Sequence, residues 1–203
     1  MPGNPPSFDT EREGLLAYLI QQRDGLKYAA YGLTEEQIRL TPTRSPLSVG
    51  GLLKHAALTE RGWTEVLLQQ PSEADPYADT FALGDDDTLP RLLARVDEVA
   101  AQTESAVNSL DDLGTKVPLP IAPWYPDNAE GFSARWILLH VIEELARHAG
   151  HADIIREHID GATMYELMAG AEGWPESDWI KPWQPAHPPP SPTAGGVNRG
   201  ARN

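Results

Sequence analysis

The sequence predicts an all-α fold, a four-helix bundle with a long crossover before the last helix. Four long stretches repeat apolar residues every three to four positions, which is the spacing of one helix face. Helix-capping residues precede these stretches, and Gly or Pro follows several of them. The third connection, residues 111–132, is long and contains four prolines. Amphipathic helices of this kind bury their apolar faces against one another in a bundle.

The first helix is expected within residues 8–32, with Asp9 as its N-cap and Gly32 as its stop. Leucines at helical spacing give it a core face. Thr34 then caps a short acidic helix, and a turn-forming connector leads to the second long helix.

The second helix is expected over residues 48–70. Its inner stripe consists of Leu52, His55, Thr59, Trp63 and Val66. His55 therefore interrupts an apolar or small-residue face, where a histidine is ordinarily a hydrogen-bonded core residue. Gly50 and Gly51 near the helix start allow another backbone or a ligand to approach closely.

The third helix is expected to start after Thr88 and to end near Leu110. Its inner stripe contains no metal-ligand type of residue, so we interpret this helix as structural: Leu89, Leu92, Val96, Val99, Thr103, Ala106 and Leu110. In the crossover that follows, residues 116–121 are expected to form a short extended segment.

The fourth helix is expected between Ser133 as N-cap and Gly161 as left-handed stop. Its inner stripe turns from apolar to polar along the helix: Ile137, Val141, Glu144, His148, His151, Ile155 and His158. A carboxylate on a core face is costly unless it is paired or binds a metal. Glu144 and His148 lie one turn apart, so both side chains can reach one divalent cation. The alternative is a surface stripe in which Glu144 pairs with Arg147 and the histidines are solvated.

In a bundle, the second and fourth helices can face each other. His55 would then meet Glu144 and His148 in the core. Three protein ligands with an open position are typical of a catalytic rather than a structural metal site. In the competing case, a bundle without metal, His55 lies away from Glu144.

The amino-acid composition argues against several classes of partner and of functional site. The chain has 203 residues and a formal net charge of −14, which argues against nucleic acid and against an anionic membrane surface as partners. Cysteine is absent, so disulfides, thiolate metal sites and a cysteine nucleophile are excluded. We recognise no signal peptide and no membrane-spanning stretch, and therefore expect a cytoplasmic protein.

Three segments are expected along the chain. Residues 1–7 form a flexible N-terminus, residues 8–170 form the bundle, and residues 171–203 form an extension rich in Pro and Trp. The tryptophans suggest that the first part of this extension packs on the bundle or on a second subunit. Disorder is expected from about residue 187.

Two segments resemble a known family. GLLKHAALTERGW in the second helix and LLHVIEELARHAGHADIIREHIDG in the fourth are similar to signature segments of the DinB-like (YfiT-like) superfamily of four-helix bundles. The closest resemblance is to an actinobacterial branch of unknown function that is similar to mycothiol-dependent enzymes. The resemblance covers about residues 8–170 and leaves out the C-terminal extension.

The resemblance implies one divalent metal, zinc or nickel, held by His55, Glu144 and His148. Many relatives have His where this chain has Glu144, and the mycothiol-dependent maleylpyruvate isomerase branch has Glu there. His151 is expected in an outer shell around the metal, as a general base, or as a substitute ligand. His140 is a weaker substitute.

The implied chemistry is that of a metal-dependent thiol S-transferase or isomerase acting on a small electrophile. A divalent metal lowers the pKa of a bound thiol, and without cysteine the thiol must be a cofactor such as mycothiol. Two alternatives stay open: a non-catalytic metal-binding protein associated with stress or detoxification, and a metal-assisted hydrolase with His151 as general base. Relatives are often dimeric, so a homodimer is also open.

Overall fold

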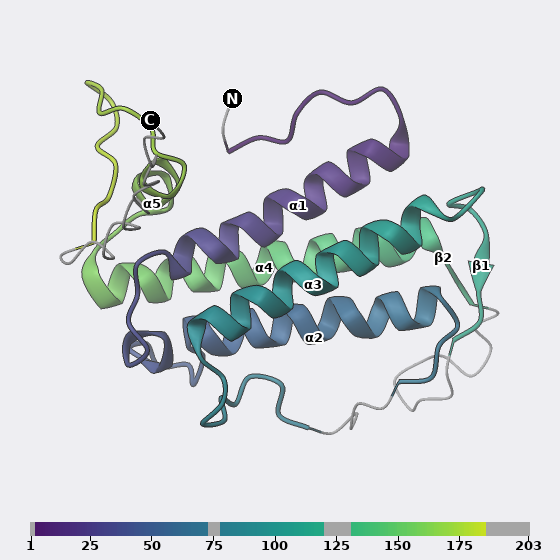
Figure 1. Ribbon diagram of the computed structural model, residues 1–203, viewed down its shortest axis with the longest axis horizontal. Helices are drawn as coiled ribbons and strands as arrows, with labels where there is room; N and C mark the ends of the chain where they lie inside the picture. Colours follow the sequence, from purple (N-terminus) through teal and green to yellow (C-terminus); the bar gives the residue numbers. More distant parts are fainter. Residues whose placement is uncertain (1–2, 73–77, 120–130, 186–203) are drawn as a thin grey trace, which may run out of the picture.

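A computed structural model of the chain describes residues 3–72, 78–119 and 131–185. Four long helices run side by side (Figure 1): α1 (Glu11–Ala30), α2 (Val49–Leu67), α3 (Leu89–Asn108) and α4 (Ala134–Asp160). Shorter elements are the 3₁₀ helix η1 (Gln37–Arg39), helix α5 (Met164–Ala171) and strands β1 (Lys116–Val117) and β2 (Phe132–Ser133). The two strands pair antiparallel at one end of the bundle. The predicted all-α four-helix bundle is therefore confirmed.

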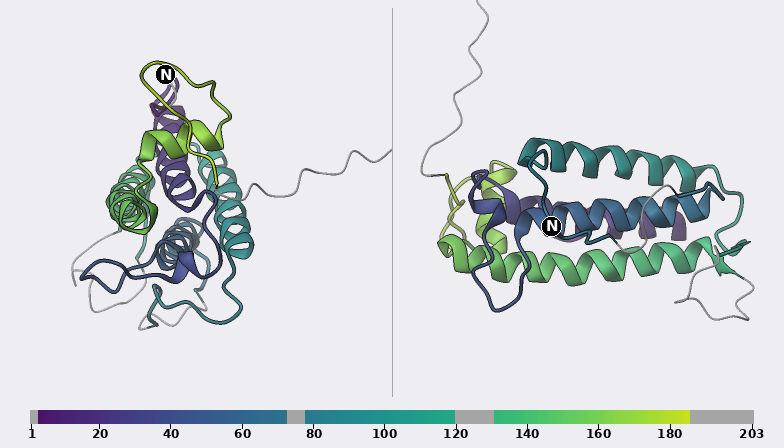
Figure 2. Two further views of the ribbon diagram at one scale, coloured as in Figure 1. Left: turned by 90° about the vertical axis from the view of Figure 1, so that its left-hand side faces the viewer. Right: turned by 90° about the horizontal axis from the view of Figure 1, so that it is seen from below.

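The helices are arranged so that α2 and α4 are neighbours. Viewed along the bundle, α1 lies beside α4 and α3 lies beside α2, while α2 also packs along α4 (Figure 2). This arrangement places the second and fourth long helices face to face, as a site shared between them requires.

Several helix ends follow the local signals in the sequence. The hydroxyl of Ser48 accepts a hydrogen bond from the Gly51 amide at 3.1 Å, and that of Ser133 accepts from the Trp136 amide at 3.2 Å. Gly161 ends α4 with a positive φ of 78°, a conformation that glycine adopts without steric cost.

The N-terminal caps of α1 and α3 differ from the prediction. Thr10, not Asp9, caps α1, because the Thr10 side chain and Glu13 form a reciprocal capping box. Thr88 precedes α3 but caps it with no side-chain hydrogen bond. The carboxylate of Glu35 accepts from the Leu89 amide instead, at 3.1 Å. A side chain distant in sequence thus replaces the local cap.

The largely apolar core contains a charged network that joins α1, α2 and α3. Arg23 and Glu60 are 3 % and 2 % exposed and form a two-pronged ion pair with distances of 2.6 and 3.0 Å. Glu104 binds Arg23 at 2.9 Å, and the Thr103 hydroxyl donates to Glu60 at 2.6 Å. Buried charges are tolerated when they are paired and hydrogen-bonded in this way.

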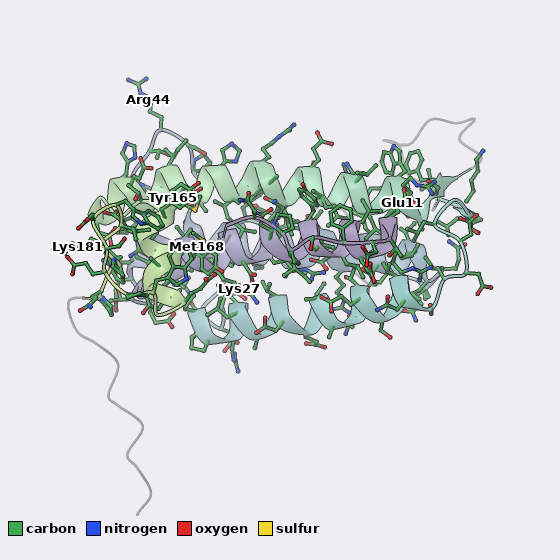
Figure 3. The ribbon with its side chains drawn as sticks, turned by 90° about the horizontal axis from the view of Figure 1, so that it is seen from above. Glu11, Lys27, Arg44, Tyr165, Met168 and Lys181 are labelled. Carbon is green, nitrogen blue, oxygen red and sulfur yellow. The ribbon has the colours of Figure 1, made fainter. Side chains whose placement is uncertain are left out.

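The chain after α4 folds back onto one end of the bundle. Figure 3 shows Tyr165 and Met168 of α5 at this end, far from Glu11 at the start of α1. The fully buried Arg156 donates to the carbonyls of Ala29 and Tyr31, and the ring of Trp183 lies 4.6 Å from its guanidinium carbon.

The early part of the C-terminal extension therefore packs on the bundle, although Trp179 within it is 75 % exposed. The disorder expected from about residue 187 concerns positions outside the described residues, and the three-segment division remains a prediction. Within the described ranges, none of the helices combines the length and the hydrophobicity that crossing a bilayer requires.

Candidate metal centre

Helices α2 and α4 bring the three predicted ligands together. His55 comes from α2, while Glu144 and His148 come from successive turns of α4. One potential ligand atom from each side chain lies within 4.8 Å of the other two. His55 thus lies beside Glu144. A bundle without metal was expected to place His55 away from Glu144. We call these three side chains the His-Glu-His cluster.

The cluster has the composition and accessibility of an open metal site. His148 is buried, whereas His55 and Glu144 are half-buried, so the cluster is partly exposed to solvent. Ligand atoms of a tetrahedral site with bonds of about 2.1 Å lie about 3.4 Å apart. The Nε2 atom of His148 and a carboxylate oxygen of Glu144 are already 3.6 Å apart. The ligand types and their spacing of at most 4.8 Å are therefore compatible with a divalent cation.

Two residues of the connection after α2 hold His55 in place. The hydroxyl of Thr80 lies 2.7 Å from Nδ1 of His55. The ring of Phe81 stacks on the imidazole, with centroids 3.9 Å apart and planes at 14°. When Nδ1–H donates to Thr80, Nε2 keeps its lone pair for a metal, which is the usual outer-shell arrangement of a histidine ligand.

Gly51 and Lys54 position this connection over α2. A Cβ atom on Gly51 would lie 2.4 Å from the carbonyl oxygen of Phe81, so only glycine admits the passing backbone. The ammonium group of Lys54 donates to the Ala82 carbonyl at 2.6 Å and to Asp87 at 2.9 Å. The expected close approach is therefore made at Gly51 by the segment that carries Thr80 and Phe81, whereas at Gly50 it is made by the Ile38 carbonyl of η1.

Burial keeps the two imidazoles neutral. Burial, with a smaller effect from the neighbouring His148, lowers the pKa of His55 to about 4, against the opposing effect of Glu144. Burial also lowers the pKa of His148, against the opposing charge of Glu144. Both rings are consequently unprotonated at neutral pH, which is the form that binds metals.

The other histidines of α4 lie outside the cluster. The Nδ1 atom of His151 lies 3.4 Å from Nδ1 of His148, whereas Glu144 lies 3.6 Å from Nε2 of the same ring. His140 contacts Trp63 and Trp136, with ring centroids 5.0 Å away from each. His158 is exposed near the end of α4 and contacts its own helix through the Ile154 carbonyl.

Glu144 does not pair with Arg147, as the surface-stripe alternative expected. Arg147 pairs with Glu143 at 3.4 Å, and Arg135 pairs with Glu11 of α1. Glu144 instead faces His148. The hydroxyl of Thr59, one turn along α2, lies 3.3 Å from Nε2 of His55 and borders the same space.

Sequence reasoning missed Thr80 as a partner of His55. Thr80 and Phe81 lie in an acidic, irregular connection that has no periodicity to indicate which side chains turn inward. The adjacent glycines of α2 were the available signal, since they predict that some backbone passes close to the helix.

Comparison with known proteins adds two findings. A family model described as mycothiol-S-transferase matches residues 14–161, which confirms the predicted resemblance to the DinB-like group of bundles. A solved structure, a conserved protein from Enterococcus faecalis, has the same fold with a TM-score of 0.62 and 13 % identity; the match covers 76 % of this chain and all of that one. The comparison with curated proteins gives no significant match.

Proposed function

Because the chain belongs to the mycothiol-S-transferase family, we propose that it is a metal-dependent S-transferase that joins a thiol of the mycothiol type to a small electrophile. The observation that carries this proposal is the His-Glu-His cluster, whose ligand atoms from two helices lie within 4.8 Å of one another. The chain has no cysteine, so the sulfur must come from a small molecule. Isomerisation of an electrophile through a reversible thiol adduct requires the same site.

In this proposal, His55, Glu144 and His148 hold one divalent metal, and two imidazoles with a carboxylate suit both zinc and nickel. The bound metal lowers the pKa of the thiol and so supplies a thiolate at neutral pH. The protein orients its ligands through outer partners: Thr80 fixes the ring of His55, and His151 lies against Nδ1 of His148.

The reaction balances without a redox partner. The sulfur electron pair forms a bond to the electrophilic carbon, and the leaving group departs with the electrons of the broken bond. The thiol proton passes to solvent. The partners are therefore two small molecules, and the net charge of −14 speaks against nucleic acid.

The position of His151 favours this reaction over the hydrolase alternative. A hydrolase needs a general base beside the open side of the metal. His151 instead lies next to the Nδ1 atom of His148, while Nε2 of His148 faces Glu144. The outer position suits a residue that orients His148.

Metal content tests the site first. Protein purified without a His tag is analysed by mass spectrometry for wild type, His148→Ala and the matched control His158→Ala, which removes an exposed histidine of the same helix. About one equivalent is expected in wild type and in the control, and little in His148→Ala. Absence of metal from the wild type, even after incubation with zinc or nickel, contradicts the proposal.

Activity is then measured with the metal-loaded protein, mycothiol and a set of electrophiles. Consumption of the thiol is expected to exceed the rate without protein and to require His148. A protein that binds metal but conjugates no electrophile supports the non-catalytic metal-binding alternative.

A further inference from the structure

Two rows of side chains, one on α2 and one on α4, extend the His-Glu-His cluster along these two neighbouring helices. On α2, His55, Thr59 and Trp63 follow each other at intervals of four residues. On α4, the row Trp136, His140, Glu144 and His148 has the same interval. Residues four apart share one helix face, so each row continues from the cluster toward the end of the bundle that carries β2.

The continuation of these rows is an aromatic cluster, which we call the aromatic platform: Trp63, Phe132, Trp136 and His140. Trp136 stacks on Phe132 with centroids 3.8 Å apart and on His140 with centroids 5.0 Å apart. Trp63 meets Trp136 edge-on at 5.5 Å and His140 at 5.0 Å. Three elements, α2, β2 and α4, thus contribute rings to one cluster.

Trp136 keeps a large apolar surface in contact with solvent although it lies in the aromatic platform. It is 40 % exposed, and the rings around it are half-buried. Its neighbours fix its orientation, so little side-chain entropy remains to be lost when another ring packs on it. Phe132 and His140 already lie nearly parallel to the indole, at 25° and 19°, so a flat apolar molecule would contact the part of the indole that these rings leave exposed.

The platform is also within reach of the cluster. A helix rises 1.5 Å per residue, so His140 is about 6 Å and Trp136 about 12 Å along α4 from Glu144. A molecule of one or two fused rings that contacts His140 and Trp136 can therefore present its reactive carbon near the cluster.

We propose that the aromatic platform binds the electrophile, and that the electrophile is a flat, apolar, aromatic compound. This inference rests on the proposed transferase function for its chemistry. For a halogenated aromatic substrate, a carbon–sulfur bond forms, the carbon–halogen bond breaks, and the halide leaves with its electron pair while the thiol proton goes to solvent. Trp136 is a binding residue in this scheme and takes no part in proton transfer.

The first test measures binding without chemistry. 1,3-Dinitrobenzene is flat and has no leaving group, and its binding is followed by calorimetry with and without zinc on wild type, Trp136→Leu, Trp136→Phe and Trp179→Leu. An aromatic contact at the exposed part of the indole predicts that Trp136→Leu weakens binding about fivefold or more, while Trp136→Phe stays within about threefold of wild type. Trp179→Leu removes a 75 % exposed tryptophan far along the chain and should have no effect.

The second test measures selectivity with zinc-loaded protein and mycothiol. For Trp136→Leu, kcat/KM for 1-chloro-2,4-dinitrobenzene is expected to fall about fivefold or more, while kcat/KM for iodoacetamide and the KM for mycothiol stay unchanged. An equal loss for both electrophiles overturns the proposal. So does a raised KM for mycothiol, which would place the sugar rings of the thiol on Trp136.

The two tests separate this inference from the proposed function. If dinitrobenzene binding depends on Trp136 but no conjugation occurs, the platform is supported and the transferase function fails. If conjugation occurs but neither binding nor selectivity responds to Trp136→Leu, the transferase function stands and the platform is wrong. Circular dichroism of Trp136→Leu, with Trp136→Phe as the conservative variant, ensures that lost binding is not lost folding.

Discussion

The Nδ1 atom of His55 lies 2.7 Å from the hydroxyl oxygen of Thr80, which belongs to the connection between α2 and α3. When Nδ1–H of His55 donates to this oxygen, Nε2 is the nitrogen that stays available to a metal. We therefore expect Thr80→Val to lower metal affinity about 10- to 100-fold, the usual effect of losing an outer-shell partner. Competition with a chromophoric zinc chelator measures the change.

Thr80→Ser is the matched control, because it keeps the hydroxyl and removes a methyl group. It should bind metal within about threefold of wild type. Equal affinity of the valine and serine variants would show that the hydroxyl does not orient His55.

The ion pair between Arg23 and Glu60 gives a prediction for stability. Arg23→Met leaves a buried carboxylate without its cation, which should lower the free energy of unfolding by about 3–5 kcal/mol. The double variant Arg23→Met/Glu60→Leu should recover most of this loss, because both charges are replaced by apolar groups. Urea unfolding followed by circular dichroism measures each value.

The exposed pair of Lys27 and Asp97 is the control, since it also joins two long helices, α1 and α3. Asp97→Asn should change the unfolding free energy by no more than about 1 kcal/mol. A double variant as unstable as Arg23→Met alone would mean that the pair sets the arrangement of the helices and does not merely satisfy its own charges.

The sequence was sufficient for the fold because the signals of the long helices are local. The caps at Ser48 and Ser133 and the stop at Gly161 each act within one helical turn. Contacts between distant residues were not predictable in this way. The Glu35 carboxylate caps α3 from 54 residues away, and Arg23 meets Glu60 across two helices.

The same distinction between local signals and distant contacts applies to the residues of the candidate site. Glu144 and His148 were predictable because four residues bring two side chains to one face of a helix. His55 could be assigned to the same site only with the added assumption that α2 faces α4. Thr80 and the platform residue Phe132 reach the site from irregular or very short segments, where position depends on the finished bundle.

Trp183 and Trp179 should differ sharply in their contribution to stability. Trp183 covers the buried guanidinium of Arg156 and packs against Tyr31 with ring centroids 5.7 Å apart. Its replacement by Ala should cost about 2 kcal/mol through lost packing and a lost cation–π contact. Trp179→Ala should stay within about 0.5 kcal/mol. Thermal and urea unfolding of both variants test the difference, and equal values would contradict the packing seen here.

The burial of Asp153 on α4 leads to a prediction of how the stability of the fold depends on pH. One of its carboxylate oxygens is buried without a hydrogen-bond partner. Burial, with a smaller effect from Glu157, raises the pKa of Asp153 from 3.8 to about 6. Above pH 6 the Asp153 carboxylate is therefore charged in both states, but it is poorly solvated in the folded protein and fully solvated in the unfolded chain. This difference lowers the stability of the fold. Between about pH 6 and 3.8 the folded state takes up a proton that the unfolded state lacks, so this group stabilises the fold progressively as pH falls.

Asp153→Asn should consequently raise the free energy of unfolding at pH 8 by about 1–2 kcal/mol, because the amide carries no charge to desolvate. Most of this gain should be absent at pH 4.5, where the wild-type carboxyl is already protonated in the folded state. Glu157→Gln removes only the neighbouring charge and should give a smaller gain at pH 8. Urea unfolding at both pH values measures all three proteins. A gain for Asp153→Asn that is equal at pH 8 and pH 4.5 would show that ionisation of Asp153 is not its cause.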